Sequence, residues 1–194
     1  SVAPANAQRP NRNHWTTDAD VGRGDGPVDD EALKAAPANS DEWLHYGGNY
    51  QGWRHSPIEQ LTPQSVGNLK LAWMAQTGVP GQLEASPVVY DGILYLTSAR
   101  NRLMALDAKT GSVMWQTQAQ ETESGYSKTA APLIVGDKVF SGIAGGEYGI
   151  RGFVDAYDIN SGERKWRFFT TPGPDNPLAE EKPDLIINWS TAGD

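Results

Sequence analysis

The stretch best suited to chemistry is rich in glycine and carries one carboxylate. Residues 144–152 are Ala-Gly-Gly-Glu-Tyr-Gly-Ile-Arg-Gly, which places Glu147 among four glycines. Glycine lets a backbone approach a ligand closely, and carboxylate oxygens suit a hard cation. The stretch therefore suits a cation site, or an anionic cofactor with its counter-ion. The alternative is an ordinary loop in which a solvated Glu147 pairs with Arg151, and composition alone leaves both readings open.

Repeated sequence motifs predict the strands and turns that position this stretch. An eleven-residue motif occurs at 105–115 and again at 156–166, with Ala, Asp, Thr or Ser, Gly and Trp in register. Its Asp-x-x-[Thr/Ser]-Gly core predicts a hairpin turn, because Asp accepts hydrogen bonds from backbone amides and Gly tolerates positive φ. Matching pieces at 86–95 and 131–140 predict a second pair of strands in each unit. Four short strands per unit are typical of a β-propeller blade.

The spacing of tryptophans supports this fold. Trp73, Trp115 and Trp166 recur at intervals close to the roughly 40–50 residues of a four-stranded blade. Such a recurring ring predicts a packing role between sheets rather than catalysis. Between its middle strands the second unit carries six more residues than the first, and the glycine-rich stretch lies in this insertion.

Composition excludes several functions. The net charge of −8, with 16 Lys and Arg, does not supply the basic surface that nucleic acid requires. The absence of cysteine excludes disulfides and thiolate chemistry. No apolar run approaches the roughly 18–20 residues of a membrane span. Residues 5–7, Ala-Asn-Ala, would suit the end of a removed export signal.

The chain is predicted to be all-β, with an irregular N-terminal segment. Residues 1–40 are expected to be flexible or loosely attached, with one short helical turn near 30–35. Residues 41–194 are expected to form an incomplete propeller, because two complete units and one partial unit cannot close a ring of about four to eight blades. An aromatic lead-in is expected to pack over the propeller; it comprises Trp43, Leu44, Tyr46, Tyr50, Trp53 and Ile58.

Together with the repeats and the glycine-rich stretch, the sequence resembles the quinoprotein alcohol dehydrogenases, which bind pyrroloquinoline quinone (PQQ) in an eight-bladed propeller. The resemblance covers about residues 41–175 and implies that Glu84 and Thr129 contact PQQ, that Gly145 and Gly146 line it, and that Glu147 ligates Ca²⁺ or a lanthanide. Without the resemblance, Glu84 would be a rim carboxylate and Thr129 an ordinary strand residue. The stretches that carry it are 43–50, 53–57, 69–73, 84–87, both eleven-residue motifs, 125–132 and 145–153.

The chain also departs from the family pattern. A further blade, with an adjacent Cys-Cys pair and a PQQ-binding arginine, normally lies between the stretches matching Trp115 and Gly125, and here only Gln116 to Ser124 separates them. Other family ligands and the catalytic aspartate come from later blades, beyond Asp194. No catalytic residue is therefore expected in this chain.

The resemblance implies a fragment of a periplasmic enzyme that oxidises an alcohol to an aldehyde by hydride transfer to PQQ. The isolated chain is expected to be inactive. Cytochrome c is the expected electron acceptor, and a homo-oligomer is left open. The alternative is a non-catalytic propeller-repeat module that binds protein partners.

Overall fold

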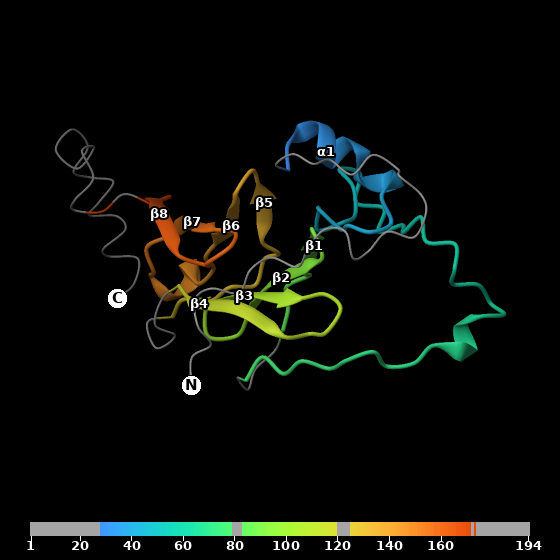
Figure 1. The fold of residues 1–194 in the computed structure, drawn as a ribbon. Helices are drawn as coiled ribbons and strands as arrows, with labels where there is room; N and C mark the ends of the chain where they lie inside the picture. Colours follow the sequence, from blue (N-terminus) through green and yellow to red (C-terminus); the bar gives the residue numbers. More distant parts are fainter. Residues whose placement is uncertain (1–27, 79–82, 120–124, 172, 174–194) are drawn as a thin grey trace.

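The fold consists of two four-stranded antiparallel sheets side by side (Figure 1). The structure is a computed structural model, which describes residues 28–78, 83–119, 125–171 and 173. The first blade contains β1 (Val88–Tyr90), β2 (Ile93–Ser98), β3 (Arg102–Asp107) and β4 (Val113–Gln118). The second blade contains β5 (Leu133–Val135), β6 (Lys138–Gly142), β7 (Phe153–Asp158) and β8 (Arg164–Phe169). The predicted partial propeller is confirmed.

The sequence repeat is also a repeat of strand register. In the first blade one cross-strand row joins Val88, Tyr95, Ala105 and Trp115. The equivalent row of the second blade joins Leu133, Phe140, Ala156 and Trp166. The register shifts directly after Ala105 in one blade and after Ala156 in the other. Because directly opposed residues share a face of a sheet, each row presents its large side chains on one side.

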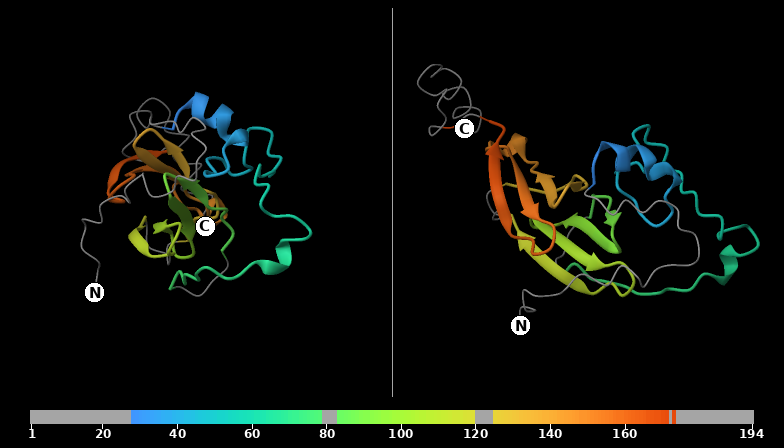
Figure 2. Two further views of the ribbon diagram at one scale, coloured as in Figure 1. Left: turned by 45° about the vertical axis from the view of Figure 1, so that its right-hand side comes forward. Right: turned by 45° about the horizontal axis from the view of Figure 1, so that its top comes forward.

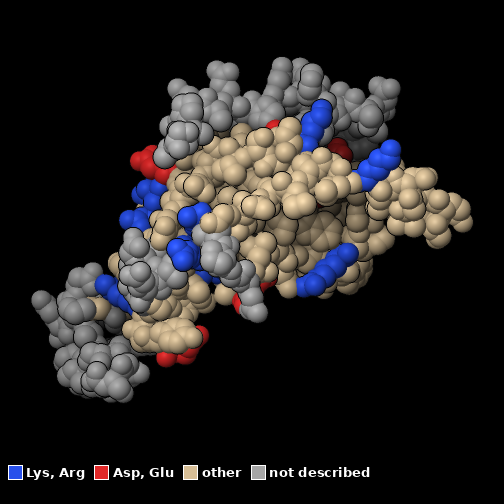
Figure 3. All heavy atoms as spheres, turned by 90° about the horizontal axis from the view of Figure 1, so that it is seen from below, with Lys and Arg blue, Asp and Glu red and all other residues tan. Residues whose placement is uncertain are grey.

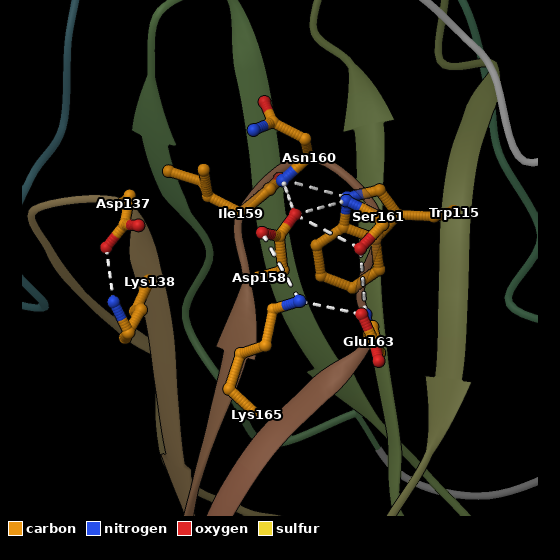
Figure 4. Close-up of polar contacts among 9 residues, drawn as sticks. All are labelled: Trp115, Asp137, Lys138, Asp158, Ile159, Asn160, Ser161, Glu163 and Lys165. Carbon is orange, nitrogen blue, oxygen red and sulfur yellow. Dashed lines mark hydrogen bonds and ion pairs between the residues drawn. The ribbon is translucent and has the colours of Figure 1, made fainter.

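Each Asp-x-x-[Thr/Ser]-Gly segment forms the predicted turn. The Asp107 carboxylate accepts hydrogen bonds from the amides of Lys109 and Thr110, at 3.0 and 2.7 Å. The Asp158 carboxylate accepts from the amides two and three residues later, at 3.0 and 2.9 Å (Figure 4). The glycines that follow have φ of +71° at Gly111 and +70° at Gly162, which explains why glycine is needed there.

Trp115 joins the first blade to the second. The Trp115 indole donates to the Ile159 carbonyl at 3.1 Å, and a Cβ added at Gly162 would lie 2.4 Å from the Trp115 ring. The two blades share one core through this contact. The predicted packing role of the tryptophans is therefore confirmed at the interface between the blades.

The segment before the blades is partly attached to them. Helix α1 (Asp30–Ala35) lies at the predicted helical turn and begins after Asp29, whose carboxylate accepts from the Ala32 amide at 2.9 Å. A 3₁₀ helix, Ala36–Ala38, follows. Val28 pairs with Gly136 and is buried, which docks residue 28 on the second blade. Residues 1–27 of the predicted flexible segment lie outside the described residues.

The aromatic lead-in packs only at its beginning. Trp43 bridges Val89 of β1 and Leu44 is buried, as expected. Tyr46, Tyr50 and Ile58 are exposed, and Trp53 is 71% exposed. From there the chain leaves the blades as a long excursion that contains the 3₁₀ helix Val66–Asn68 and returns toward β3 and β4 (Figures 1 and 2). We call residues 54–78 the arm.

On the face drawn in Figure 3, charged side chains are dispersed, and Lys and Arg side chains stand singly or in small groups on a mostly uncharged background. In the part of the chain that the structure describes, no helix has the length and apolar character to cross a membrane.

Candidate functional site

The glycine-rich insertion forms a loop of its own at one end of the second blade. It connects β6 to β7 and contains the 3₁₀ helix Gly146–Tyr148, whereas the equivalent link of the first blade is only residues 99–101. Gly145 has φ of +118°, and an added Cβ would lie 2.2 Å from the Gly125 carbonyl oxygen, so a side chain does not fit there. Gly146 faces open space, and the Glu147 side chain is exposed.

Backbone pairing joins this loop to the segment before β5. The Ser127 amide donates to the Ala144 carbonyl at 2.9 Å, and the Ala144 amide donates to the Ser127 carbonyl at 2.7 Å. Thr129, two residues after Ser127, is exposed. The fold therefore places the Thr129 segment and the Glu147 loop at the same end of the second blade.

Glu84 occupies the equivalent place in the first blade. It lies four residues before β1, as Thr129 lies four residues before β5, and it is exposed. The Thr97 hydroxyl of β2 donates to the Ala130 carbonyl at 2.8 Å, which ties the first blade to the Thr129 segment. The predicted residues thus share one end of both blades, although within the described ranges no hydrogen bond or ion pair joins Glu84, Thr129 and Glu147.

Glu147 is a single carboxylate. Within the described residues it forms no ion pair, and the expected alternative partner Arg151 instead stacks 3.7 Å from the Phe169 ring centre. The same residues contain no group of three or more His, Asp or Glu side chains placed to hold a metal ion. Within the described residues, Glu147 therefore offers a cation a single carboxylate and no cluster of ligands.

Sequence reasoning did not find a buried lysine beside this loop. Lys128 Nζ donates to Ser141 Oγ at 2.7 Å and to the Gly142 carbonyl at 3.1 Å, so it fastens the end of β6, from which the loop departs. Burial lowers the pKa of Lys128 to about 8, opposed by the charge of Asp155. The only signal in the sequence is alternation: because Thr129 points outward in an extended segment, Lys128 points inward.

A second buried group supports β7 and β8 behind the loop. Arg167 donates from Nε and Nη2 to the two carboxylate oxygens of Asp155, at 2.7 and 2.8 Å, and Tyr157 donates to the same carboxylate at 2.8 Å. Burial and the neighbouring Asp155 raise the pKa of Tyr157. Arg167 also donates to the Ala119 carbonyl of the first blade at 2.9 Å, so this cluster links both blades.

Lys128 makes the stability of the chain depend on pH. Its pKa is about 8 in the fold and near its ordinary 10.5 in the unfolded chain, so between these values the unfolded chain binds more protons and stability rises with pH. We expect the free energy of unfolding to rise by about 1–2 kcal/mol between pH 7 and 9.5. Urea unfolding at both pH values measures this. Lys128→Met should remove most of the rise, whereas the exposed Lys70→Met should retain it; equal slopes in both variants would contradict the assignment.

Comparisons with known proteins agree with the repeat and the fold. Residues 43–130 match the family described as glucose/ethanol/alcohol dehydrogenase, beta-propeller domain. The quinohemoprotein alcohol dehydrogenase ADH IIB of Pseudomonas putida is 32% identical, over 81% of this chain and 30% of its own length. The lanthanide-dependent methanol dehydrogenase of Methylacidiphilum fumariolicum is 28% identical, over 78% of this chain and 33% of its own length.

Solved structures give the same result. A europium-containing methanol dehydrogenase superposes with a TM-score of 0.54 and 25% identity, over 74% of this chain and 34% of its own. The quinohemoprotein alcohol dehydrogenase ADHIIG of Pseudomonas putida superposes with a TM-score of 0.50 and 30% identity, over 79% and 30% of the two chains.

The two repeats and their sheets define the chain as part of a β-propeller. By these matches it is similar to the PQQ-dependent alcohol dehydrogenases, and it spans about a third of the length of the relatives that it matches. The alignment with ADH IIB runs over 209 residues but uses 81% of a 194-residue chain. The alignment is therefore longer than the part of this chain that it uses, and the difference is close to one blade of roughly 40–50 residues. This difference supports the prediction that a blade is missing.

Proposed function

We propose that this chain contributes part of the cofactor site of a PQQ- and metal-dependent enzyme that oxidises an alcohol to an aldehyde. The observation that carries the proposal is the reciprocal hydrogen bonding of Ser127 and Ala144, which holds the Thr129 segment against the Glu147 loop. The family match supplies the class of cofactor. When bound, PQQ supplies the hydride acceptor and the cation acts as a Lewis acid that polarises it.

The residues of this end suit the roles proposed for them. Gly146 leaves open space where a flat cofactor would lie against backbone, and Gly145 keeps the loop close to the Gly125 carbonyl. Glu147 offers carboxylate oxygen, the donor that Ca²⁺ and the trivalent lanthanides favour. Glu84 and Thr129, exposed at equivalent places of the two blades, would contact PQQ from neighbouring sides.

The isolated chain should not turn over. Six to eight oxygen ligands are typical of Ca²⁺, and Glu147 offers at most two of them. The proposal therefore includes further ligands and the catalytic base from outside this chain. A periplasmic location, cytochrome c as electron acceptor, and the choice between calcium and a lanthanide belong to the same proposal.

Glu147→Gln tests the metal assignment. PQQ and LaCl₃ are titrated together into the folded chain, and binding is measured by calorimetry. Binding should weaken by at least about tenfold in Glu147→Gln, because the substitution removes the negative charge of one ligand of the ion. Glu59→Gln makes the same change at an exposed carboxylate of the arm. It is the matched control, and this variant should bind as the wild type does. Equal binding by Glu147→Gln and wild type would refute the ligand role. Failure of the wild type to bind PQQ would refute a cofactor site that this chain forms in part on its own, and would favour a non-catalytic propeller module.

A further inference from the structure

The Thr129 segment, residues 125–130, lies directly against the first half of the Glu147 loop. Ser127 and Ala144 exchange two backbone hydrogen bonds, at 2.9 and 2.7 Å. Gly125 packs so closely on the loop that an added Cβ would lie 2.8 Å from Tyr148 Cβ. The position of the loop therefore depends on the position of this segment.

The side chain of Lys128 fastens the segment to the end of β6. This side chain is buried, and its Nζ donates to Ser141 Oγ at 2.7 Å and to the Gly142 carbonyl at 3.1 Å. The loop begins directly after Gly142, where β6 ends. Because Lys128 lies between Ser127 and Thr129, lifting these residues from the loop draws Nζ out of the interior and into water.

The groups near Lys128 only partly replace the water that its Nζ loses in the interior. Asp155 and Tyr157 lie near it on β7 and Arg167 on β8, with Nζ 5.8 Å from the centre of the Tyr157 ring. The Asp155 carboxylate is already bound by Arg167 and Tyr157. Burial therefore lowers the pKa of Lys128 to about 8 despite the charge of Asp155, so a proton on Nζ is held better in water than in the interior.

We propose that Lys128 is a positioning residue of the proposed cofactor site. Release of the Nζ proton to water favours closure of the Thr129 segment on the Glu147 loop, and uptake of the proton favours lifting of the segment. The inference rests on the proposed function for the identity of the ligand, because closure is what brings Thr129 beside the loop that carries Glu147. The coupling between the proton and the loop belongs to the chain without ligand, so it can be measured separately.

The amide of Ala144 reports on closure. It is bonded to the Ser127 carbonyl, so it exchanges with solvent when the segment lifts. In the chain without ligand, protection of this amide should increase about tenfold from pH 7 to pH 9. The reason is that Lys128 in the lifted segment keeps its proton up to the ordinary pKa of 10.5, whereas in the interior it loses the proton near 8. Exchange is measured by NMR, and each rate is divided by that of an unstructured chain at the same pH.

A second amide separates lifting of the segment from unfolding of the blade. Ala156 lies in β7, between β6 and β8, and is fully buried. Its amide should be protected at least about tenfold more than that of Ala144, because it exchanges only when the sheet opens. Equal protection of the two amides would mean that the segment does not move by itself, and would overturn the proposal.

Three variants test the role of Lys128. Lys128→Met keeps the length of the side chain without its proton and should abolish the pH dependence at Ala144. Lys138→Met, at a lysine that pairs with Asp137 at the surface of the same blade, is the matched control and should retain it. Ser141→Ala removes one acceptor of Nζ and should lower protection of Ala144 a few-fold at both pH values. This variant keeps the test decisive if Lys128→Met does not fold.

Three results in the chain without ligand would overturn the proposal. The first is protection of Ala144 that does not change with pH in the wild type. The second is a pH dependence that persists in Lys128→Met. The third is a loss of protection in Ser141→Ala that is absent, or that is equal at Ala144 and Ala156.

Addition of PQQ and LaCl₃ connects the closure to the site. If calorimetry shows binding, protection of Ala144 should increase at both pH values, and unchanged protection in the bound chain would refute the positioning role. Absence of binding would refute the cofactor site and the positioning role with it. The pH profile without ligand would then still confirm or refute the coupling between Lys128 and the loop.

Discussion

Trp115→Ala is expected to lower the free energy of unfolding by about 3–5 kcal/mol, the range for removing a large buried aromatic side chain. The ring is almost fully buried, packs near Tyr95 and lies over Gly162, and its indole N–H bonds the Ile159 carbonyl. Its loss leaves a cavity between the two blades that neither sheet can fill without moving as a whole. Because a domain of this size is stable by only about 5–15 kcal/mol, this one change would remove a large part of the total.

Urea unfolding followed by circular dichroism measures the effect. Trp53→Ala, whose ring is exposed, should change stability by no more than about 0.5 kcal/mol. Trp115→Phe keeps part of the ring but loses the hydrogen bond, so it should fall between the two and remain measurable if Trp115→Ala does not fold. A loss below about 1 kcal/mol for Trp115→Ala would mean that the two blades do not depend on this contact.

Asp155→Ala is expected to lower the free energy of unfolding by about 3–5 kcal/mol, which is the range for removing one partner of a buried ion pair. The Asp155 carboxylate is fully buried and accepts from Arg167 and Tyr157, and its charge also opposes the lowered pKa of Lys128. Without it, two cations lie near one another with no buried anion between them. The second blade should therefore lose stability most.

Arg167→Ala and the double variant complete a cycle for this pair. The sum of the losses in unfolding free energy of the two single variants should exceed the loss of the double variant. The reason is that each single variant leaves one buried charge without its counter-charge. Glu163→Ala removes a carboxylate of the same blade that is exposed and paired with Lys165, so its effect should stay within about 1 kcal/mol. Additive losses at Asp155 and Arg167 would contradict the coupling.

Much of the fold could be predicted because its signals are local. The Asp107 and Asp158 turns need only a carboxylate, a few backbone amides and a glycine at positive φ, all within five residues. The blades follow from repeated strand and turn patterns of the same kind. The position of the Glu147 loop follows too, because a longer link between two paired strands must emerge at the end of the sheet where they join.

Contacts between distant residues could not be predicted in the same way. Nothing in the sequence around Lys128, Asp155 or Arg167 indicates that the three gather in one interior, because this depends on the register of β6, β7 and β8 and on which face each strand presents. Its composition predicts that the aromatic lead-in packs over the propeller, yet Trp53 faces solvent. Aromatic composition predicts burial on average but does not say which rings find a surface to cover.

By itself, then, the sequence determined the repeat, the turns, the two blades, the glycine-rich loop with its carboxylate and the family that they resemble. Only the tertiary structure decided that Trp73 and Trp115 each pack over a glycine and donate to a backbone carbonyl, and that Lys128 is held in the interior beside the loop. The physical reason is that turns are fixed by interactions within a few residues. Burial and ion pairing, in contrast, are properties of surfaces that exist only once the sheets have packed together.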